Sequence, residues 1–248
     1  MAKKINVGAL ISGGGTNLQA IIDATLDNSH GNSHENSIDA KIVFTGSDNP
    51  GVKGLERAQQ ANIDTFVVDY SKIIQSCKKD GINEVDLPKD FNLKEIESKQ
   101  KLFAPGASQK QIDFFLKSRA IAEKQLLDKI VAYEMDLLVL AGFMRVLTPY
   151  FIDRINIEPE KYRIMNIHPA LLPSFPGTDG YGDTFAYGCK IGGCTVHYID
   201  YGEDTGPIIG QKAFEIEEHD TLDDIKRKGL EKEWELYPQC IQKFIESL

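Results

Sequence analysis

The feature that most constrains the fold is the alternation of short apolar runs and helical patterns over the first 68 residues. The apolar runs 5–11, 40–45 and 63–68 have the length of buried strands. A helix is predicted after the first run and another at 52–61, because apolar residues recur there at helical spacing. Strand–helix–strand units in this order form parallel sheets with right-handed crossovers. The start of the chain therefore predicts an open α/β fold.

The remainder of the chain continues this pattern after one interruption. A long helix is predicted over 111–134, and a fully apolar central strand over 136–141. The predicted strands 191–200 and 208–216 are joined by a short glycine-rich loop, which is typical of an antiparallel pair appended to a parallel sheet. An amphipathic helix at 220–248 closes the chain. We predict a Rossmann-like, doubly wound, mostly parallel sheet with an antiparallel edge pair.

The interruption lies between Tyr70 and about Lys110. It is rich in lysine, contains Pro88 and Pro105, and shows only fragments of amphipathic periodicity. A connection of this length is uncommon in a compact domain unless it is functional, mobile or an oligomer contact. We interpret 70–110 as an insertion within the domain that runs over the solvated surface. The sequence leaves its role open, and it is compatible with a homo-oligomer.

Length and charge narrow the class of protein. A chain of 248 residues can bury one substantial core, so we expect 1–248 to be a single domain. The net charge of −9 disfavours a general nucleic-acid or membrane-surface binder, because no basic stripe offsets the repulsion. No stretch of the sequence reaches the about 20 apolar residues that cross a bilayer. We expect a cytoplasmic protein whose partners are small molecules, with no nucleic acid and no membrane.

Metal binding is not expected from the sequence. The four cysteines lack metal-ligand spacing, and we interpret them as reduced thiols. His30 and His34 lie four residues apart in a polar stretch, but this stretch has neither a helical pattern nor a third ligand. We therefore predict no metal site.

A first candidate site is the glycine-rich turn Ser12-Gly-Gly-Gly-Thr-Asn17, between the first predicted strand and helix. Glycines allow the backbone to approach a ligand closely, and the free amides at the start of a helix suit a phosphate. The spacing is not that of the dinucleotide fingerprint. A purely structural alternative is a tight turn in which Thr16 caps the helix.

A second candidate site is the stretch 163–177, which reads Arg-Ile-Met-Asn-Ile-His-Pro-Ala-Leu-Leu-Pro-Ser-Phe-Pro-Gly. A short buried strand is predicted to end at Met165, after which three prolines force a stiff loop. Asn166 and His168 stand at positions i and i+2 of this exit, so their side chains point to one side, at the sheet edge where ligands bind. Alternatively, Asn166 caps a turn and His168 is a surface histidine.

The run Asn166-Ile-His-Pro-Ala-Leu-Leu-Pro-Ser-Phe-Pro-Gly177, followed by Asp204-Thr-Gly-Pro-Ile208, closely resembles the signature of the folate-dependent formyltransferases, above all the members that act in purine biosynthesis. The glycine-rich turn and Ala141-Gly-Phe-Met-Arg-Val-Leu147 share this resemblance, which spans most of the chain outside the insertion. It implies transfer of a formyl group from 10-formyltetrahydrofolate, a co-substrate, to the amine of glycinamide ribonucleotide, a phosphorylated ribonucleotide.

The resemblance also implies a role for each matching residue. Asn166, His168 and Asp204 would be catalytic, because an amide and an imidazolium can donate to an oxyanion and a carboxylate favours the imidazolium. The ribonucleotide would bind to Gly15, Thr16, Asn17 and Glu233. The folate would bind to Arg119, Met144, Arg145, Val146, Leu147 and Asn166. Local patterns alone favour a solvated helix glutamate at Glu233, and an exposed helix arginine fits Arg119 equally well.

Several alternatives can be weighed against this reading. A methionyl-tRNA formyltransferase would need positive surface, a formyltetrahydrofolate hydrolase a His-His variant of the motif where Pro169 stands, and an amino sugar nucleotide remains an alternative acceptor. A non-catalytic nucleotide-binding protein would keep the glycine-rich turn, but the intact Asn166, His168 and Asp204 set disfavours it. One departure concerns Asp179, because relatives commonly have a histidine there, which puts any accessory role of this position in doubt.

Overall fold

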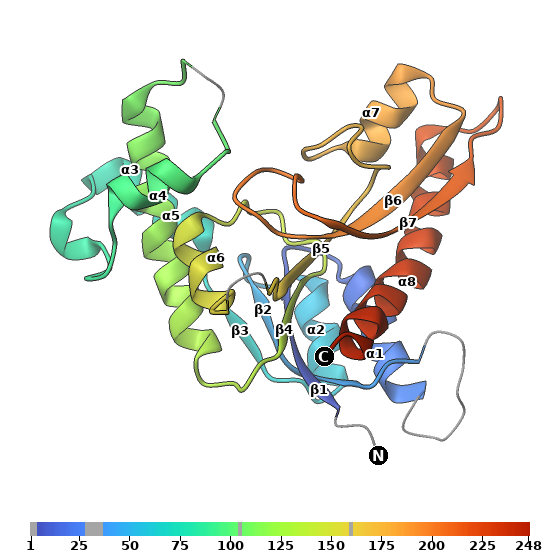
Figure 1. The fold of residues 1–248 in the computed structure, drawn as a ribbon, viewed down its shortest axis with the longest axis horizontal. Coiled ribbons are helices and arrows are strands. Elements are labelled where there is room, and N and C mark those ends of the chain that lie inside the picture. Colours follow the sequence, from blue (N-terminus) through green and yellow to red (C-terminus); the bar gives the residue numbers. More distant parts are fainter. Residues whose placement is uncertain (1–3, 28–36, 104–105, 159–160) are drawn as a thin grey trace.

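The computed structural model describes residues 4–27, 37–103, 106–158 and 161–248. Within them the strands form a seven-stranded sheet in the order β3-β2-β1-β4-β5-β6-β7 (Figure 1). Strands β1 to β5 run parallel, whereas β6 is antiparallel to both β5 and β7. The strands are β1 (Ile5–Ile11), β2 (Ala40–Ser47), β3 (Thr65–Val67), β4 (Leu137–Leu140), β5 (Ile164–His168), β6 (Ile191–Tyr198) and β7 (Ile208–Glu215). The predicted mostly parallel sheet with an antiparallel edge pair is confirmed.

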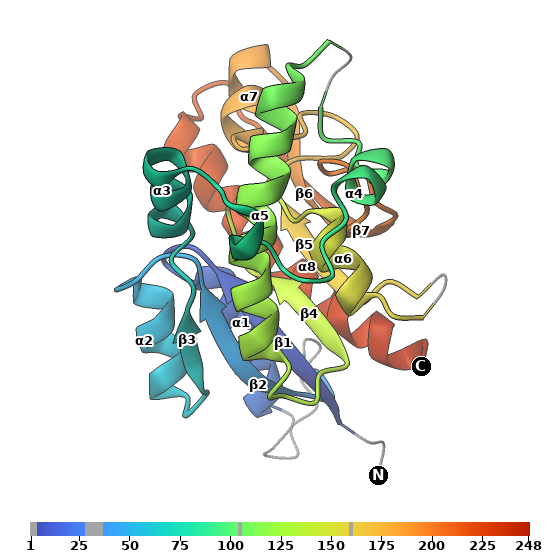
Figure 2. The ribbon, with the colours of Figure 1, turned by 90° about the vertical axis from the view of Figure 1, so that its left-hand side faces the viewer.

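Helices cover both faces of the sheet (Figures 1 and 2). Because successive strand side chains point to opposite faces, Leu137 and Val139 of β4 join the core under α1, α2 and α8, whereas Leu138 and Leu140 join the core under α5 and α6. The helices are α1 (Thr16–Asp27), α2 (Lys53–Gln60), α3 (Tyr70–Asp80), the 3₁₀ helix η2 (Glu84–Asp86), α4 (Leu93–Lys99), α5 (Gln109–Ile130), α6 (Pro149–Ile155), α7 (Gly180–Tyr187) and α8 (Leu222–Glu246). No helix among the described residues is both long and apolar enough to span a membrane.

The segment 70–110 differs from the solvated excursion that we predicted. It forms α3, η2 and α4, and the two α-helices lie on either side of α5 (Figure 2). Tyr70 is completely buried, and Ile96 of α4 packs against Leu116 of α5 and Tyr150 of α6. Part of the amphipathic pattern in this segment is therefore a real helix, since Leu93 and Ile96 lie on α4 and extend the core. The description of 70–110 as an insertion relative to the family stays a prediction.

Strand β5 extends further than predicted, because we expected it to end at Met165. It covers Ile164–His168, so Asn166 and His168 are its last residues rather than part of the following loop. The extension follows from pairing with β6, in which Asn166 lies opposite His197 and His168 opposite Thr195. Hydrogen bonds to a neighbouring strand keep this end of β5 extended, and they fix the direction of its polar side chains.

Candidate active site

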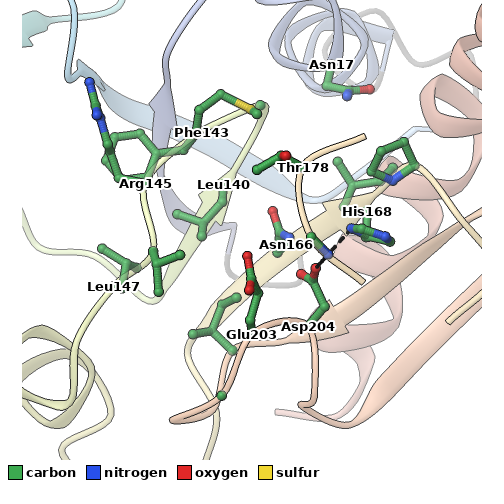
Figure 3. Close-up of a pocket in the computed structure, with 18 of the residues that line it drawn as sticks. Asn17, Leu140, Phe143, Arg145, Leu147, Asn166, His168, Thr178, Glu203 and Asp204 are labelled. Carbon is green, nitrogen blue, oxygen red and sulfur yellow. Dashed lines mark hydrogen bonds and ion pairs between the residues drawn. The ribbon is translucent and has the colours of Figure 1, made fainter. Parts of the chain in front are cut away.

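A cavity of about 240 Å³ lies at the carboxyl ends of β4 and β5 (Figure 3). Its walls also come from the start of α1, from α8 and from the loop between β6 and β7. Most of the residues predicted for the site line this one cavity: Asn17, Met144, Arg145, Val146, Leu147, Asn166, His168, Asp204 and Glu233. Gly15, Thr16 and Arg119 are not among its lining residues.

His168 and Asp204 form a buried pair at the floor of the cavity (Figure 3). The Nδ1 atom of His168 lies 3.2 Å from Oδ2 of Asp204, and the two side chains are only 3% and 11% exposed. The other ring nitrogen, Nε2, lies 2.8 Å from the backbone carbonyl oxygen of Phe175. Both nitrogens thus face acceptors, and the doubly protonated ring is the form that makes both bonds.

His197 is a fourth polar residue of this group, which the sequence reasoning missed. Its Nδ1 donates to the carbonyl of Tyr198 at 2.9 Å. Its Nε2 lies 3.3 Å from the amide nitrogen of Asn166 and 3.5 Å from Oδ1 of Asp204. A neutral His197 accepts from Asn166, whereas a protonated one donates to Asp204, so the two residues compete for one ring nitrogen.

Asp204 is held as a carboxylate by its surroundings. Burial acts to raise its pKa, but hydrogen bonds from His197 and from the Gly177 backbone N–H, with the charge of His168, outweigh it and lower the pKa. The Gly177 N–H donates to Oδ2 of Asp204 at 2.8 Å. Asp204 has a positive φ of 54°, an uncommon conformation for a residue other than glycine. The loop therefore holds an ionised carboxylate in a conformation that needs support from its neighbours.

Glu233 is buried, so the solvated helix glutamate that local sequence patterns favoured is wrong. It is 5% exposed, and it accepts hydrogen bonds of 2.6 Å from both Asn17 Nδ2 and Tyr181 Oη. Burial raises the pKa of Glu233, and the two hydrogen bonds oppose that shift. The Tyr181 ring fits only because residue 229 is glycine, since a Cβ there would come within 2.1 Å of the ring. Sequence periodicity placed Glu233 on α8 but gave no sign of these partners.

The glycine-rich turn has a structural role that the sequence only partly indicated. Gly15 has φ of 69°, and a Cβ on it would lie 2.6 Å from the Cα of Gly54 in α2. A Cβ on Gly13 or Gly14, in contrast, would meet no atom within 4 Å. Thr16 is the first residue of α1 rather than its cap. Close helix packing thus explains Gly15, and Gly13 and Gly14 leave the backbone open to an approaching ligand.

The residues after β4 form the apolar side of the cavity. Leu140, Phe143 and Leu147 are buried, and the N–H of Met144 donates to Oγ of Ser12 at 2.8 Å. Arg145 makes an ion pair with the buried Asp48, which anchors this turn to the end of β2. The residues after β4 therefore form an apolar wall of the cavity, which contacts with Ser12 and Asp48 hold in place.

Arg119 lies on α5, away from the cavity lining. Its guanidinium carbon is 5.1 Å from the Phe115 ring centroid and 5.5 Å from that of Tyr70. Burial lowers its pKa, and its Nε and Nη1 atoms are buried without a hydrogen-bond partner among the described residues. A contact between Arg119 and a ligand in the cavity finds no support in this arrangement.

Other lining residues were not predicted for the site, although Phe143, Ile167, Pro169 and Gly177 lie within the motifs quoted above. They include Leu140, Phe143, Ile167, Pro169, Gly177, Thr178, Ile199, Gly202 and Glu203. Proximity to Asp204 could have indicated 199–203, whereas Thr178 follows the Pro-Gly step and carries no pattern. Asp179 caps α7 by accepting from the Gly182 N–H at 3.3 Å, which gives this departure from the family pattern a structural explanation.

Metal ligation finds no candidate in the part of the chain that the structure describes, because no group of three or more His, Cys, Asp or Glu side chains there could hold an ion. His30 and His34 lie outside the described residues.

The doubly wound fold and this cavity define an enzyme class: one that holds a small molecule at the carboxyl edge of a sheet and stabilises charge with an amide, an imidazole and a carboxylate. The chain belongs to the formyl transferase family, whose model matches residues 5–241.

Relatives cover nearly the whole chain. The phosphoribosylglycinamide formyltransferase of Bacillus subtilis (strain 168) is 31% identical over 94% of this chain and 91% of that protein. The trifunctional purine biosynthetic protein adenosine-3 of Drosophila melanogaster is 33% identical over 98% of this chain, which spans 14% of that protein. The structure of glycinamide ribonucleotide transformylase 1 from Symbiobacterium toebii matches with a TM-score of 0.71 at 31% identity, over 100% of this chain and 90% of that one.

Proposed function

We propose that this chain transfers a formyl group from 10-formyltetrahydrofolate to the amine of glycinamide ribonucleotide, a step of purine biosynthesis. Membership of the formyl transferase family and the names of the relatives support this activity. The observation that carries the proposal is the position of Asn166, His168 and Asp204 in one cavity, which Glu233 and Met144 also line. Two substrates that meet at the polar floor would thus approach from walls of different chemistry.

The folate donor fits the apolar side of the cavity. A pterin ring is flat and carries several hydrogen-bonding atoms at its edge, so it needs a slot with exposed backbone groups. Leu140, Phe143, Val146 and Leu147 would line such a slot, together with Ile199, Gly202 and Glu203 from the other side of the same cavity.

The ribonucleotide fits the opposite side, between α1 and α8. Asn17 at the start of α1 and Glu233 on α8 are hydrogen-bonded to each other and line the cavity. A phosphate would bind the open backbone of Gly13 and Gly14 and the first amides of α1, where the helix dipole is positive. Glu233 would accept from a hydroxyl or an amine of the nucleotide.

The reaction requires the amine nitrogen to form a bond to the formyl carbon while the bond from that carbon to N10 of the folate breaks. The carbonyl oxygen gains negative charge in the tetrahedral intermediate, and Asn166 would donate a hydrogen bond to it. His168 would also donate to it through Nε2, with the oxyanion taking the place of the Phe175 carbonyl oxygen. The Asp204 carboxylate, 3.2 Å from Nδ1 of His168, would keep the ring oriented for this donation. The attacking nitrogen loses a proton and the leaving nitrogen gains one, and His168 would move this proton.

The test is turnover of the purified chain with 10-formyltetrahydrofolate and three acceptors in parallel: glycinamide ribonucleotide, an amino sugar nucleotide and water. We expect rapid loss of the donor only with glycinamide ribonucleotide. Asn166→Ala should lower kcat by roughly two orders of magnitude, as removal of an oxyanion donor does, whereas Glu218→Gln on the exposed surface should not. Turnover with water alone would identify a hydrolase, and binding of both substrates without turnover would contradict the proposal.

A further inference from the structure

The segment 70–110 reaches the loop that carries Asp204. Just after α4, the backbone N–H of Lys101 donates to the carbonyl oxygen of Tyr201 at 2.8 Å. Tyr201 stands three positions before Asp204, in the connection between β6 and β7. A backbone hydrogen bond thus joins two parts of the chain that are about 100 residues apart in sequence.

A second contact joins the same elements through side chains. The hydroxyl of Tyr201 donates to Oδ1 of Asp153 on α6, and Nζ of Lys99 on α4 donates to Oδ2 of the same carboxylate at 2.8 Å. Hydrogen bonds to Asp153 and Glu95 raise the pKa of Lys99, so its ammonium form is secure at neutral pH. Asp153 therefore bridges the end of α4 to the loop.

Helix α4 is itself held by further contacts, so it can support the loop that it touches. Asp90, shortly before α4, pairs with Arg154 of α6 at 2.7 Å and accepts from the hydroxyl of Tyr150 at 3.2 Å. Ile96 of α4 is 5% exposed in the core that α5 and α6 share. Buried apolar contacts hold α4 rigid, and the partly exposed ion pairs add modestly to them.

What Tyr201 supports is one wall and part of the floor of the cavity. Ile199, Gly202, Glu203 and Asp204 all line it. The positive φ of Asp204 costs free energy, and such a conformation persists only where the surroundings hold it. Tyr201 is the residue within this loop that binds both α6 and the segment after α4.

We propose that the segment 70–110 is a positioning element, which holds the β6–β7 loop through Tyr201 and thereby sets the Asp204 carboxylate and the wall for the formyl donor. Lys99, Lys101 and Tyr201 are positioning residues in this scheme, since they touch neither reacting group. The kinetic consequences rest on the proposed function, whereas the mechanical link does not.

The link is tested by hydrogen exchange of the amides in 199–207, compared among variants of the full chain. Tyr201→Phe and Lys99→Met should each speed exchange there roughly three- to tenfold, the effect of losing one hydrogen bond. The double variant should be scarcely faster than the faster single one, because both act through Asp153. Lys94→Met, at an exposed position of the same helix, should leave exchange unchanged.

A second pair of variants separates the backbone contact from the side chain. Lys101→Pro removes the N–H that donates to the backbone carbonyl oxygen of Tyr201. The preceding residue, Gln100, already has the extended backbone that a following proline requires, with ψ of 145°. Lys101→Ala keeps the N–H and is the matched control. Proline should loosen 199–207 and alanine should not.

Kinetics then distinguish positioning from simple loss of stability. Tyr201→Phe and Lys101→Pro should raise KM for the folate several-fold and lower kcat, with KM for the ribonucleotide unchanged. Unaltered exchange at 199–207 in Tyr201→Phe, Lys99→Met and Lys101→Pro overturns the proposal whatever the activity. Equal changes in both KM values also overturn it, because they indicate general destabilisation. An unaltered chain that is inactive on the ribonucleotide refutes the proposed function and leaves the exchange result to decide the link.

Discussion

Replacing Asp204 by asparagine removes the charge next to His168 while keeping the shape and the acceptor for the Gly177 N–H. The carboxylate and the ring are 3.2 Å apart and nearly buried, so solvent screens their attraction little. Hydrogen bonds between charged groups contribute about 1.5 to 3 kcal/mol, which corresponds to a factor of roughly ten to one hundred. We expect Asp204→Asn to lower kcat by this factor, because the amide no longer favours the imidazolium that donates to the oxyanion.

The informative quantity is the coupling between the two residues. His168→Ala should lower kcat by roughly two or more orders of magnitude. If Asp204 acts mainly through His168, Asp204→Asn should cost less than about threefold in the His168→Ala background, since residues that act as a unit are not additive. Any loss of kcat that Asp204→Asn still causes in the His168→Ala background is attributed to the contact of Asp204 with His197.

Steady-state turnover of the unaltered chain, the two single variants and the double variant, at saturating concentrations of both substrates, measures this coupling. Glu218→Gln removes the same charge at an exposed position and controls for the change in net charge. Equal fold losses for Asp204→Asn in the presence and absence of His168 would refute the reasoning, because the carboxylate would then act independently of the imidazole.

Three further predictions follow from single positions. Tyr181→Phe leaves Glu233 with one hydrogen bond and should raise KM for the ribonucleotide roughly tenfold without changing KM for the folate, as kinetics at varied ribonucleotide will show. Gly15→Val should lower Tm by several degrees because its side chain would collide with α2, whereas Gly14→Ala should keep Tm and weaken only ribonucleotide binding in calorimetric titration. Burial raises the pKa of Glu123 from 4.5 to about 7, despite hydrogen bonds from Thr148. The protonated form therefore stabilises the fold, and this contribution is lost as pH rises from about 4.5 to 7. As pH rises over this range, the Tm of Glu123→Gln should therefore increase relative to the Tm of the unaltered chain. Parallel curves of Tm against pH would contradict the raised pKa of Glu123.

The sequence allowed correct prediction of those elements whose signals are local. The limits of β1 at Ile5–Ile11 were predicted because the apolar run ends there at a serine followed by three glycines. The amphipathic fragments of 70–110 were visible too. Their burial was not, because α4 finds its apolar partners on α5 and α6, and single-sequence periodicity does not reveal which surfaces meet.

The candidate site divides in the same way. The sequence predicted that Asn166 and His168 would share a side, since a strand fixes that direction within itself. Pairing with β6 brings His197 to Asn166, and this register depends on contacts between distant segments. Glu233 had the pattern of an exposed helix position, and only the fold brings Tyr181 and Asn17 to it. Polar residues whose partners lie far away in sequence are the ones that local reasoning cannot place.

Following the formyl carbon itself tests the central claim most directly. The donor carries ¹³C in its formyl group, the acceptor is glycinamide ribonucleotide, and the carbon is observed by NMR during turnover. The account predicts that the label moves from N10 of the folate to the amine of the ribonucleotide in one step, with no release of labelled formate and no labelled protein. Label that appears as formate, or that is retained on the protein, would contradict direct transfer within this cavity.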